Sequence, residues 1–157
     1  MLCIALVKRG IEEWTSPEDF HHIAGLGLVR ACVEREDGTS HLILQGIARV
    51  EFSGFIQEGP YPIAKIHELP SQSAEETETE TLTAKLLSIC AQLRDRGVGV
   101  PQSLDEQLAQ IDDPEVLSDV VAHTFLRDPY RRQDVLEELR VGERLRLLIR
   151  HLTVEMA

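Results

Sequence analysis

The chain has 157 residues, of which 43% are hydrophobic and only 4% aromatic, so it can bury a core and must build it mainly from Leu, Ile and Val. There are 16 Lys and Arg against 27 Asp and Glu, a net charge of −11. This acidity opposes binding to nucleic-acid backbones, because that affinity comes largely from basic side chains that neutralise phosphates.

The first 70 residues carry strand patterns. Residues 2–8 form a continuous apolar run of strand length, which predicts a strand buried on both faces. The run is too short for a signal-peptide core or a membrane span, so we expect a cytoplasmic protein with reduced thiols and no membrane association. Residues 11–22 are polar and interrupted by Pro17, which predicts a loop.

A hairpin follows this loop. Two apolar runs, 25–34 and 40–45, flank Asp37-Gly38, a dipeptide that takes positive φ at little cost and favours a tight turn. Residues 47–56 predict a longer strand in which Gly54 marks a bend or bulge. A turn at 57–60 and a last strand at 62–69 complete the β-rich half.

The second half of the chain has a helical period. Residues 71–81 are acidic and lack an apolar face, so we expect a solvated connector whose second half could begin a helix. One apolar stripe covers 82–93 and ends at the glycine-containing stretch 97–101. Asp113-Pro114 and Asp128-Pro129 each predict a helix start, with Asp as the cap and Pro at the first helical position.

The order of these elements, with the hairpin followed by Gly46-Ile-Ala-Arg49 and then by the later strands, resembles that of the N-terminal substrate-binding domain of Lon proteases. The segment that starts at Asp113-Pro114 is similar to the Asp-Pro and Leu-x-Asp-x-x-Ala helix of that family, and residues 133–145 are similar to its Gln-x-x-Leu-Glu and Glu-Arg-Leu pattern. The positions that match the family's structural pattern are Gly25, Gly46, Arg49, Asp119, Gln133, Glu137, Glu143 and Arg144.

The resemblance implies an α+β fold with three parts. These are a partly closed, mostly antiparallel β-barrel of the PUA-like type over 1–70, the acidic connector over 71–81, and a C-terminal α-helical bundle over 82–157. It also implies a non-enzymatic module that recognises unfolded or degron-bearing protein segments, and it leaves room for a protease or chaperone as a further partner. The alternatives are an RNA-binding PUA-like module and a truncated Lon-type fragment without independent function.

The chain departs from the family pattern in two respects. The family opens with a further strand and helix, whereas Met1 directly precedes the run at 2–8, so we expect either an upstream start or a trimmed form with an open sheet edge. The sequence also lacks a Gly-x-x-x-x-Gly-Lys-Ser/Thr phosphate loop and a Ser-Lys peptidase domain. We therefore expect a stand-alone domain that is not an enzyme and needs no cofactor.

Three aromatic side chains are candidate contacts to a protein substrate. Trp14, Phe55 and Tyr61 lie in or beside predicted loops, and aromatic anchors dominate contact energetics. The alternative is that Trp14 and Phe55 pack on their own sheet. We expect Arg49 to tie loop carbonyls or a carboxylate together. The scattered histidines and cysteines predict no metal site.

Overall fold

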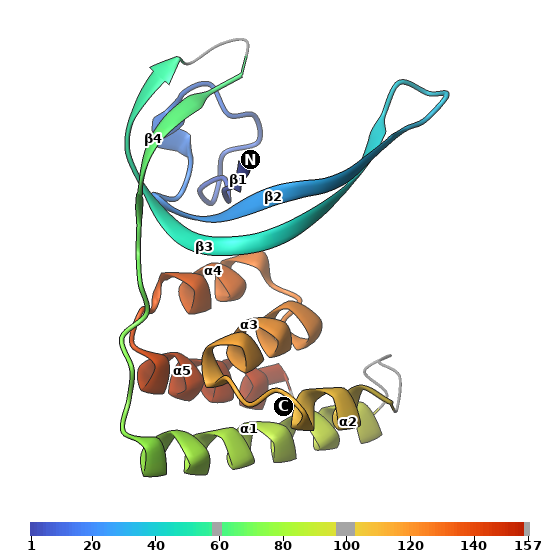
Figure 1. Ribbon diagram of the computed structural model, residues 1–157, viewed down its shortest axis with the longest axis vertical. Coiled ribbons are helices and arrows are strands. Elements are labelled where there is room, and N and C mark those ends of the chain that lie inside the picture. Colours follow the sequence, from blue (N-terminus) through green and yellow to red (C-terminus); the bar gives the residue numbers. More distant parts are fainter. Residues whose placement is uncertain (58–60, 97–102, 156–157) are drawn as a thin grey trace. The chain divides into compact units, whose positions relative to one another are not determined.

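A computed structural model describes residues 1–57, 61–96 and 103–155 of the chain. Most of the turn predicted at 57–60 and the helix end predicted at 97–101 lie outside these residues. The chain forms two compact units, Met1–Pro70, here the β unit, and Ser71–Ala157, here the helical unit. Strands therefore precede helices, and the predicted α+β class is confirmed (Figure 1).

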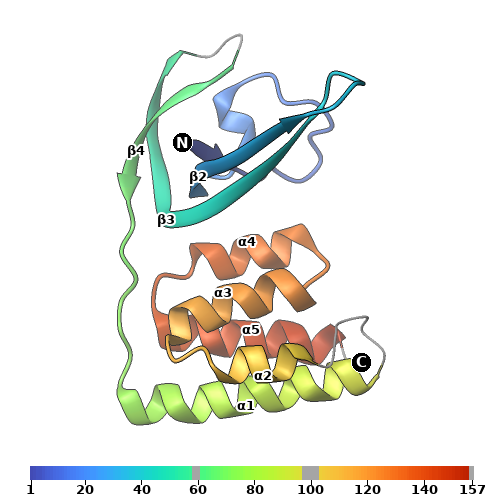
Figure 2. The same cartoon turned by 45° about the vertical axis from the view of Figure 1, so that its right-hand side comes forward.

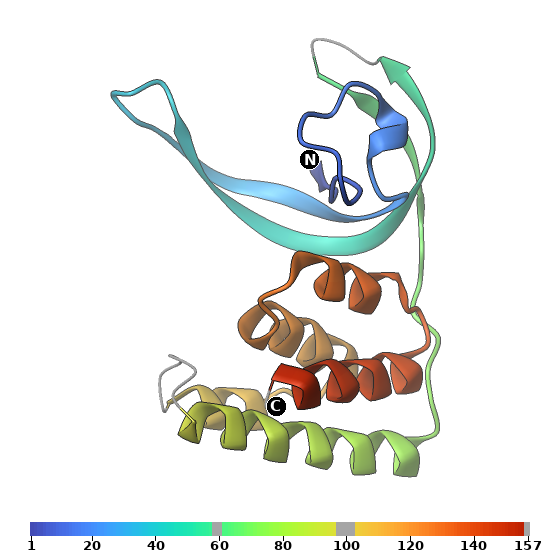
Figure 3. The same ribbon diagram turned by 180° about the vertical axis from the view of Figure 1, so that it is seen from behind.

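The β unit contains a four-stranded antiparallel sheet in the order β1-β2-β3-β4. Its strands are β1 (Leu2–Ile4), β2 (Ile23–Glu34), β3 (Ser40–Gln57) and β4 (Ile63–Glu68). β1 and β4 are the two edges of this sheet, which is open within the described residues. The inner strands β2 and β3 extend beyond both edge strands as a long hairpin, seen from two sides in Figures 1 and 3.

Two strand predictions were wrong in detail. Only Leu2–Ile4 of the run 2–8 forms a regular strand, and Leu2 and Ile4 are 41% and 57% exposed rather than buried. A continuous apolar run does not distinguish a central strand from an edge strand, which lacks a neighbour on one side. The runs 40–45 and 47–56 form one strand, because Gly46 continues the ladder opposite Gly27.

The tight turn predicted at Asp37-Gly38 is confirmed. Gly38 has a φ of 82°, and the Asp37 carboxylate accepts hydrogen bonds from the backbone N–H and the hydroxyl of Thr39 at 3.0 and 2.6 Å. These bonds hold the pKa of Asp37 below its usual range, with the Thr39 hydroxyl as the largest cause. The local chemistry of the turn therefore sets the register of the hairpin.

The helical unit contains α1 (Glu76–Asp95), α2 (Ser103–Ala109), α3 (Pro114–Phe125), α4 (Pro129–Glu137) and α5 (Val141–Glu155). Both Asp-Pro starts are confirmed, because Asp113 and Asp128 accept hydrogen bonds from the backbone N–H groups of Glu115 and Tyr130 at 2.8 and 2.9 Å. Helix α1 begins within the acidic stretch 71–81, and its first turn holds Glu76 and Glu78, where carboxylates favour the helix N-terminus.

The buried apolar core of the helical unit is continuous. Helix α5 contacts α1, α3 and α4, and α1 also contacts α2 (Figure 2). Leu86, Leu117, Leu145 and Leu152 in this cluster have no exposed surface. Among the described residues of the β unit, only Ala24 and Val50 are buried apolar side chains. None of the described helices is long and apolar enough to cross a membrane.

Candidate functional site

The β unit carries an apolar cavity of about 580 Å³ on one face of its sheet. Both edge strands contribute to its walls, Leu2 and Cys3 from β1 and Ile63 and Ala64 from β4. Among the described residues, none of the side chains that line it is acidic or basic. Burial raises the pKa of the Cys3 thiol, which keeps that group neutral. We call this cavity the aromatic pocket, because three Phe or Tyr side chains from β3 and the segment before β4 line it.

A bulge in β3 explains why two of these aromatic rings lie on the same face. Phe52 and Phe55 are three residues apart, and in a regular strand such residues point to opposite faces. The pairing with β4 shifts between Phe52 and Gly54, so that Phe52 pairs with Ile66 and Phe55 with Ala64. Gly54 adopts a φ of +150°, which L-residues rarely take. The two Phe rings consequently lie 5.5 Å apart in the pocket wall.

The structure places the three predicted aromatic contacts around this pocket. Phe55 and Tyr61 line it, and the Tyr61 side chain is 63% exposed. Trp14 is 42% exposed, and its ring centroid lies 5.3 Å from that of Phe20, which also lines the pocket. Their role in substrate binding remains a prediction, but all three side chains belong to one apolar region.

Sequence reasoning missed Phe20, which lies at the end of a loop without a periodic pattern. The Asp19 carboxylate accepts hydrogen bonds from the backbone N–H groups of Thr15 and Ser16 at 2.7 and 3.0 Å, and these bonds, led by that from Thr15, lower the pKa of Asp19. The Lys8 N–H donates to the Asp19 carbonyl at 2.7 Å, which attaches the loop to the segment after β1. The loop is thereby fixed, and with it the position of Phe20.

The three family positions of the β unit lie in the β2–β3 ladder. Gly25 pairs with Arg49, and Gly46 pairs with Gly27. A Cβ atom at Gly25 or Gly46 would meet no atom within 4 Å, so nothing in the structure explains glycine at these two positions. Arg49 is 7% exposed, and its carbonyl accepts a hydrogen bond from the Leu69 N–H at 2.8 Å. The bonding predicted for its guanidinium remains a prediction.

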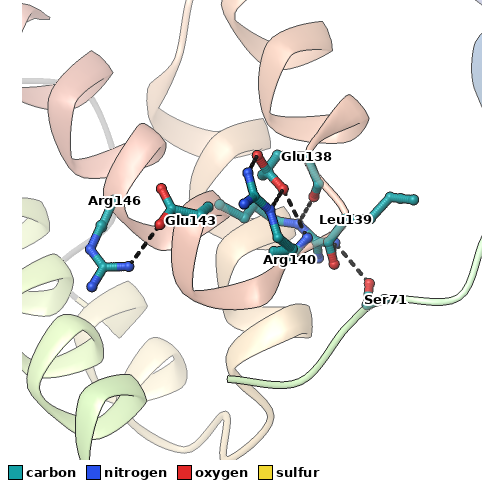
Figure 4. A network of polar contacts seen from close by, with 7 residues as sticks. Ser71, Glu138, Leu139, Arg140, Glu143 and Arg146 are labelled. Atoms are coloured by element: carbon teal, nitrogen blue, oxygen red, sulfur yellow. Dashed lines mark hydrogen bonds and ion pairs between the residues drawn. The ribbon is translucent and has the colours of Figure 1, made fainter. Parts of the chain in front are cut away.

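Arg144 in the helical unit is completely buried and joins three segments of that unit. Its Nε donates to the Glu138 carbonyl at 2.7 Å, and its Nη2 donates to the Ser71 hydroxyl at 2.7 Å; these two partners are labelled in Figure 4. Its Nη1 lies 3.3 Å from the Glu115 carboxylate, which also accepts a hydrogen bond from Ser71. Arg144 therefore fixes the start of the helical unit against the loop before α5 and the first turn of α3.

The other family positions of the helical unit lie on its helices. The buried Gln133 donates to the Glu137 carboxylate at 2.8 Å, within α4. Glu143 accepts a hydrogen bond from Arg146 at 3.1 Å on the surface of α5 (Figure 4). Asp119 is exposed on α3. These contacts lie within single helices, which is consistent with a structural role.

A second cavity of about 570 Å³ lies in the helical unit, and its lining includes several acidic side chains. Among residues 1–57, 61–96 and 103–155, no group of three or more His, Cys, Asp or Glu side chains is arranged to hold a metal ion. The thiol of Cys90 is buried in the core, and burial raises its pKa to about 12, which disfavours the reactive thiolate. The aromatic pocket is therefore the stronger candidate for binding.

Comparison with known proteins gives a consistent family. The family profile described as the ATP-dependent protease La (LON) substrate-binding domain matches residues 2–154. The Lon protease of Desulfosudis oleivorans is 29% identical over 89% of this chain and 17% of its own length. The Lon protease 1 of Herpetosiphon aurantiacus is 32% identical, again over 89% of this chain and 17% of its own length.

A solved structure shares the fold. The N-terminal domain of Mycobacterium avium complex Lon protease superimposes with a TM-score of 0.71, at 19% identity, over 96% of this chain and 77% of that chain. The chain spans about a fifth of the length of the curated relatives that it matches, as with the Lon protease of Dictyoglomus thermophilum, where 99% of this chain covers 20% at 25% identity.

Proposed function

Because the chain belongs to the family of ATP-dependent protease La (LON) substrate-binding domains, we propose that it recognises protein segments and does no chemistry on them. The observation that carries this proposal is the aromatic pocket, which is apolar, open at the surface of the β unit and, among the described residues, lined by no acidic or basic side chain. A protein segment that exposes apolar side chains could bury them in this pocket. Unfolded or degron-bearing segments expose such side chains, whereas most folded surfaces do not.

The size of the pocket supports modest affinity. Burial of apolar surface contributes about 25 cal/mol per Å², so a client side chain that buries about 100 Å² contributes roughly 2.5 kcal/mol. Two or three such side chains, after the cost of ordering the segment, favour reversible binding rather than permanent capture. Reversible binding suits a module that passes its client to a protease or chaperone, and it requires no cofactor.

The charge of the chain supports a protein client over RNA. A net charge of −11 repels phosphate, and the pocket wall contributes no Lys or Arg within the described residues. A cytoplasmic location and the absence of a membrane partner form part of the same proposal.

Trp14 fluorescence provides the test, because its ring packs on Phe20 in the pocket wall. We expect a saturable change on titration with an unfolded model protein and none with its folded counterpart or with RNA at low salt. Tyr61→Ala should weaken binding, whereas Ile43→Ala should not, although the two side chains are 63% and 64% exposed. Equal binding of the folded and unfolded proteins, or equal loss in both variants, would contradict the proposal.

A further inference from the structure

We propose that the client segment binds as an additional β-strand along the free edge of β4, with alternate side chains in the aromatic pocket. This inference rests on the proposed function and specifies the conformation and the class of client segment. Recognition of this kind takes its affinity from main-chain hydrogen bonds and its specificity from pockets for alternate side chains.

The position of the pocket relative to the sheet edges is the first observation. β4 pairs only with β3 in the described residues, so every second residue of β4 directs its N–H and C=O groups away from the sheet. β4 has six residues and β1 only three, so β4 offers the longer free edge, about 20 Å at 3.4 Å per residue. An extended segment laid along β4 would border the pocket beside Ile63, Ala64 and Ile66.

The orientation of side chains in β4 is the second observation. Phe52 pairs with Ile66 and Phe55 with Ala64, and all four side chains line the pocket. Residues that lie opposite each other in an antiparallel pair share a face. A strand added to β4 continues the same pleat, so every second residue of the client would lie over the pocket beside Ala64 or Ile66.

The other face of β4 defines the remaining client residues. Lys65 and His67 alternate with the pocket residues and are exposed. The expected client is therefore an extended segment in which apolar residues alternate with polar residues. Beside Lys65, an acidic residue would gain an opposite-charge pair and a basic residue would be repelled.

Lys65 also explains why this edge can remain accessible. A charged side chain on an edge strand opposes indiscriminate pairing with other sheets, and Lys is common in that role. Pairing with β4 is then favourable only for a segment that also fills the pocket. The edge and the pocket together provide the selectivity.

The test uses the whole chain and a short peptide of alternating Val and Thr with Lys at both ends. The matched probe is the same peptide with N-methyl groups on alternate backbone nitrogens, which removes the main-chain donors and keeps the side chains. We expect the unmodified peptide to bind and the methylated peptide to bind at least about tenfold more weakly, since each lost hydrogen bond weakens binding. Amide hydrogen exchange should slow at residues 63–68 when the unmodified peptide is bound.

The outcomes separate this inference from the function on which it rests. Equal affinity of the two peptides, or binding without slower exchange at 63–68, would overturn strand addition and leave client recognition standing. Slower exchange at residues 2–4 instead would assign the strand to β1 and overturn the assignment to β4. If neither the peptides nor an unfolded protein binds, the proposed function itself fails.

Discussion

Replacement of Arg144 by Lys provides a quantitative test of the helical unit. The guanidinium of the fully buried Arg144 contacts Glu138, Ser71 and Glu115 from three different nitrogen atoms. A Lys ammonium is a single point charge on a flexible stem and cannot occupy all three positions. Hydrogen bonds to charged groups contribute about 1.5–3 kcal/mol each, so loss of the bond to the Glu138 carbonyl and weakening of one other contact should cost about 3 kcal/mol.

Thermal and urea unfolding followed by far-ultraviolet circular dichroism would measure this loss, because that signal reports the helices. For a unit of this size, about 3 kcal/mol corresponds to a decrease of roughly 15 °C in Tm. Arg146→Lys is the matched control on the same helix, since Arg146 is 42% exposed and forms surface ion pairs with Glu78 and Glu143. Such pairs contribute at most about 1 kcal/mol. A Tm for Arg144→Lys within a few degrees of that control would refute the bridging role.

Four further substitutions test local features. Gly54→Ala should destabilise the β unit by about 1–3 kcal/mol, because its φ of +150° is strained for Ala, and should weaken client binding by disturbing the bulge. Gly10→Ala at φ +86° should destabilise without affecting binding, and equal binding losses would contradict this reasoning. Asp113→Ala should cost about 1 kcal/mol of helical stability, measured by urea unfolding, because it removes the cap of α3, and an unchanged midpoint would argue against that cap. The hydrogen bond from the Thr15 N–H is the largest cause that lowers the pKa of Asp19 in the folded protein. The ionised Asp19 carboxylate therefore stabilises the fold fully above the ordinary Asp pKa, and this stabilisation is lost as pH falls through the lower pKa of the folded state. Asp19→Asn should therefore reduce the acid dependence of fluorescence from the tryptophan of the same loop, and an unaltered acid transition would exclude this role.

Features encoded by neighbouring residues were predictable from the sequence. The turn at Asp37-Gly38 and the helix starts at Asp113 and Asp128 depend on side chains that bond to backbone groups two residues away. The α+β order of the units follows from the change in apolar period near residue 70. These features can be predicted because they depend on residues close together in the sequence.

Features that depend on distant pairing were not predictable in the same way. The edge position of β1 follows from its pairing with β2 alone, which no apolar pattern reports. The bulge that aligns Phe52 with Phe55 is visible only in the register with β4, although Gly54 indicated a bend. Phe20 joins the candidate site through a loop anchored by Asp19, and that anchoring depends on a segment before the loop.

The small buried core of the β unit has a thermodynamic consequence. Ala24 and Val50 are its only buried apolar side chains among the described residues, so little of its folding free energy comes from its own interior. A client that binds only the folded form would increase the free energy of unfolding of the β unit by mass action. The increase is about 2.7 kcal/mol at a free client concentration of one hundred times Kd. The melting temperature of the sheet would then report how much client is present.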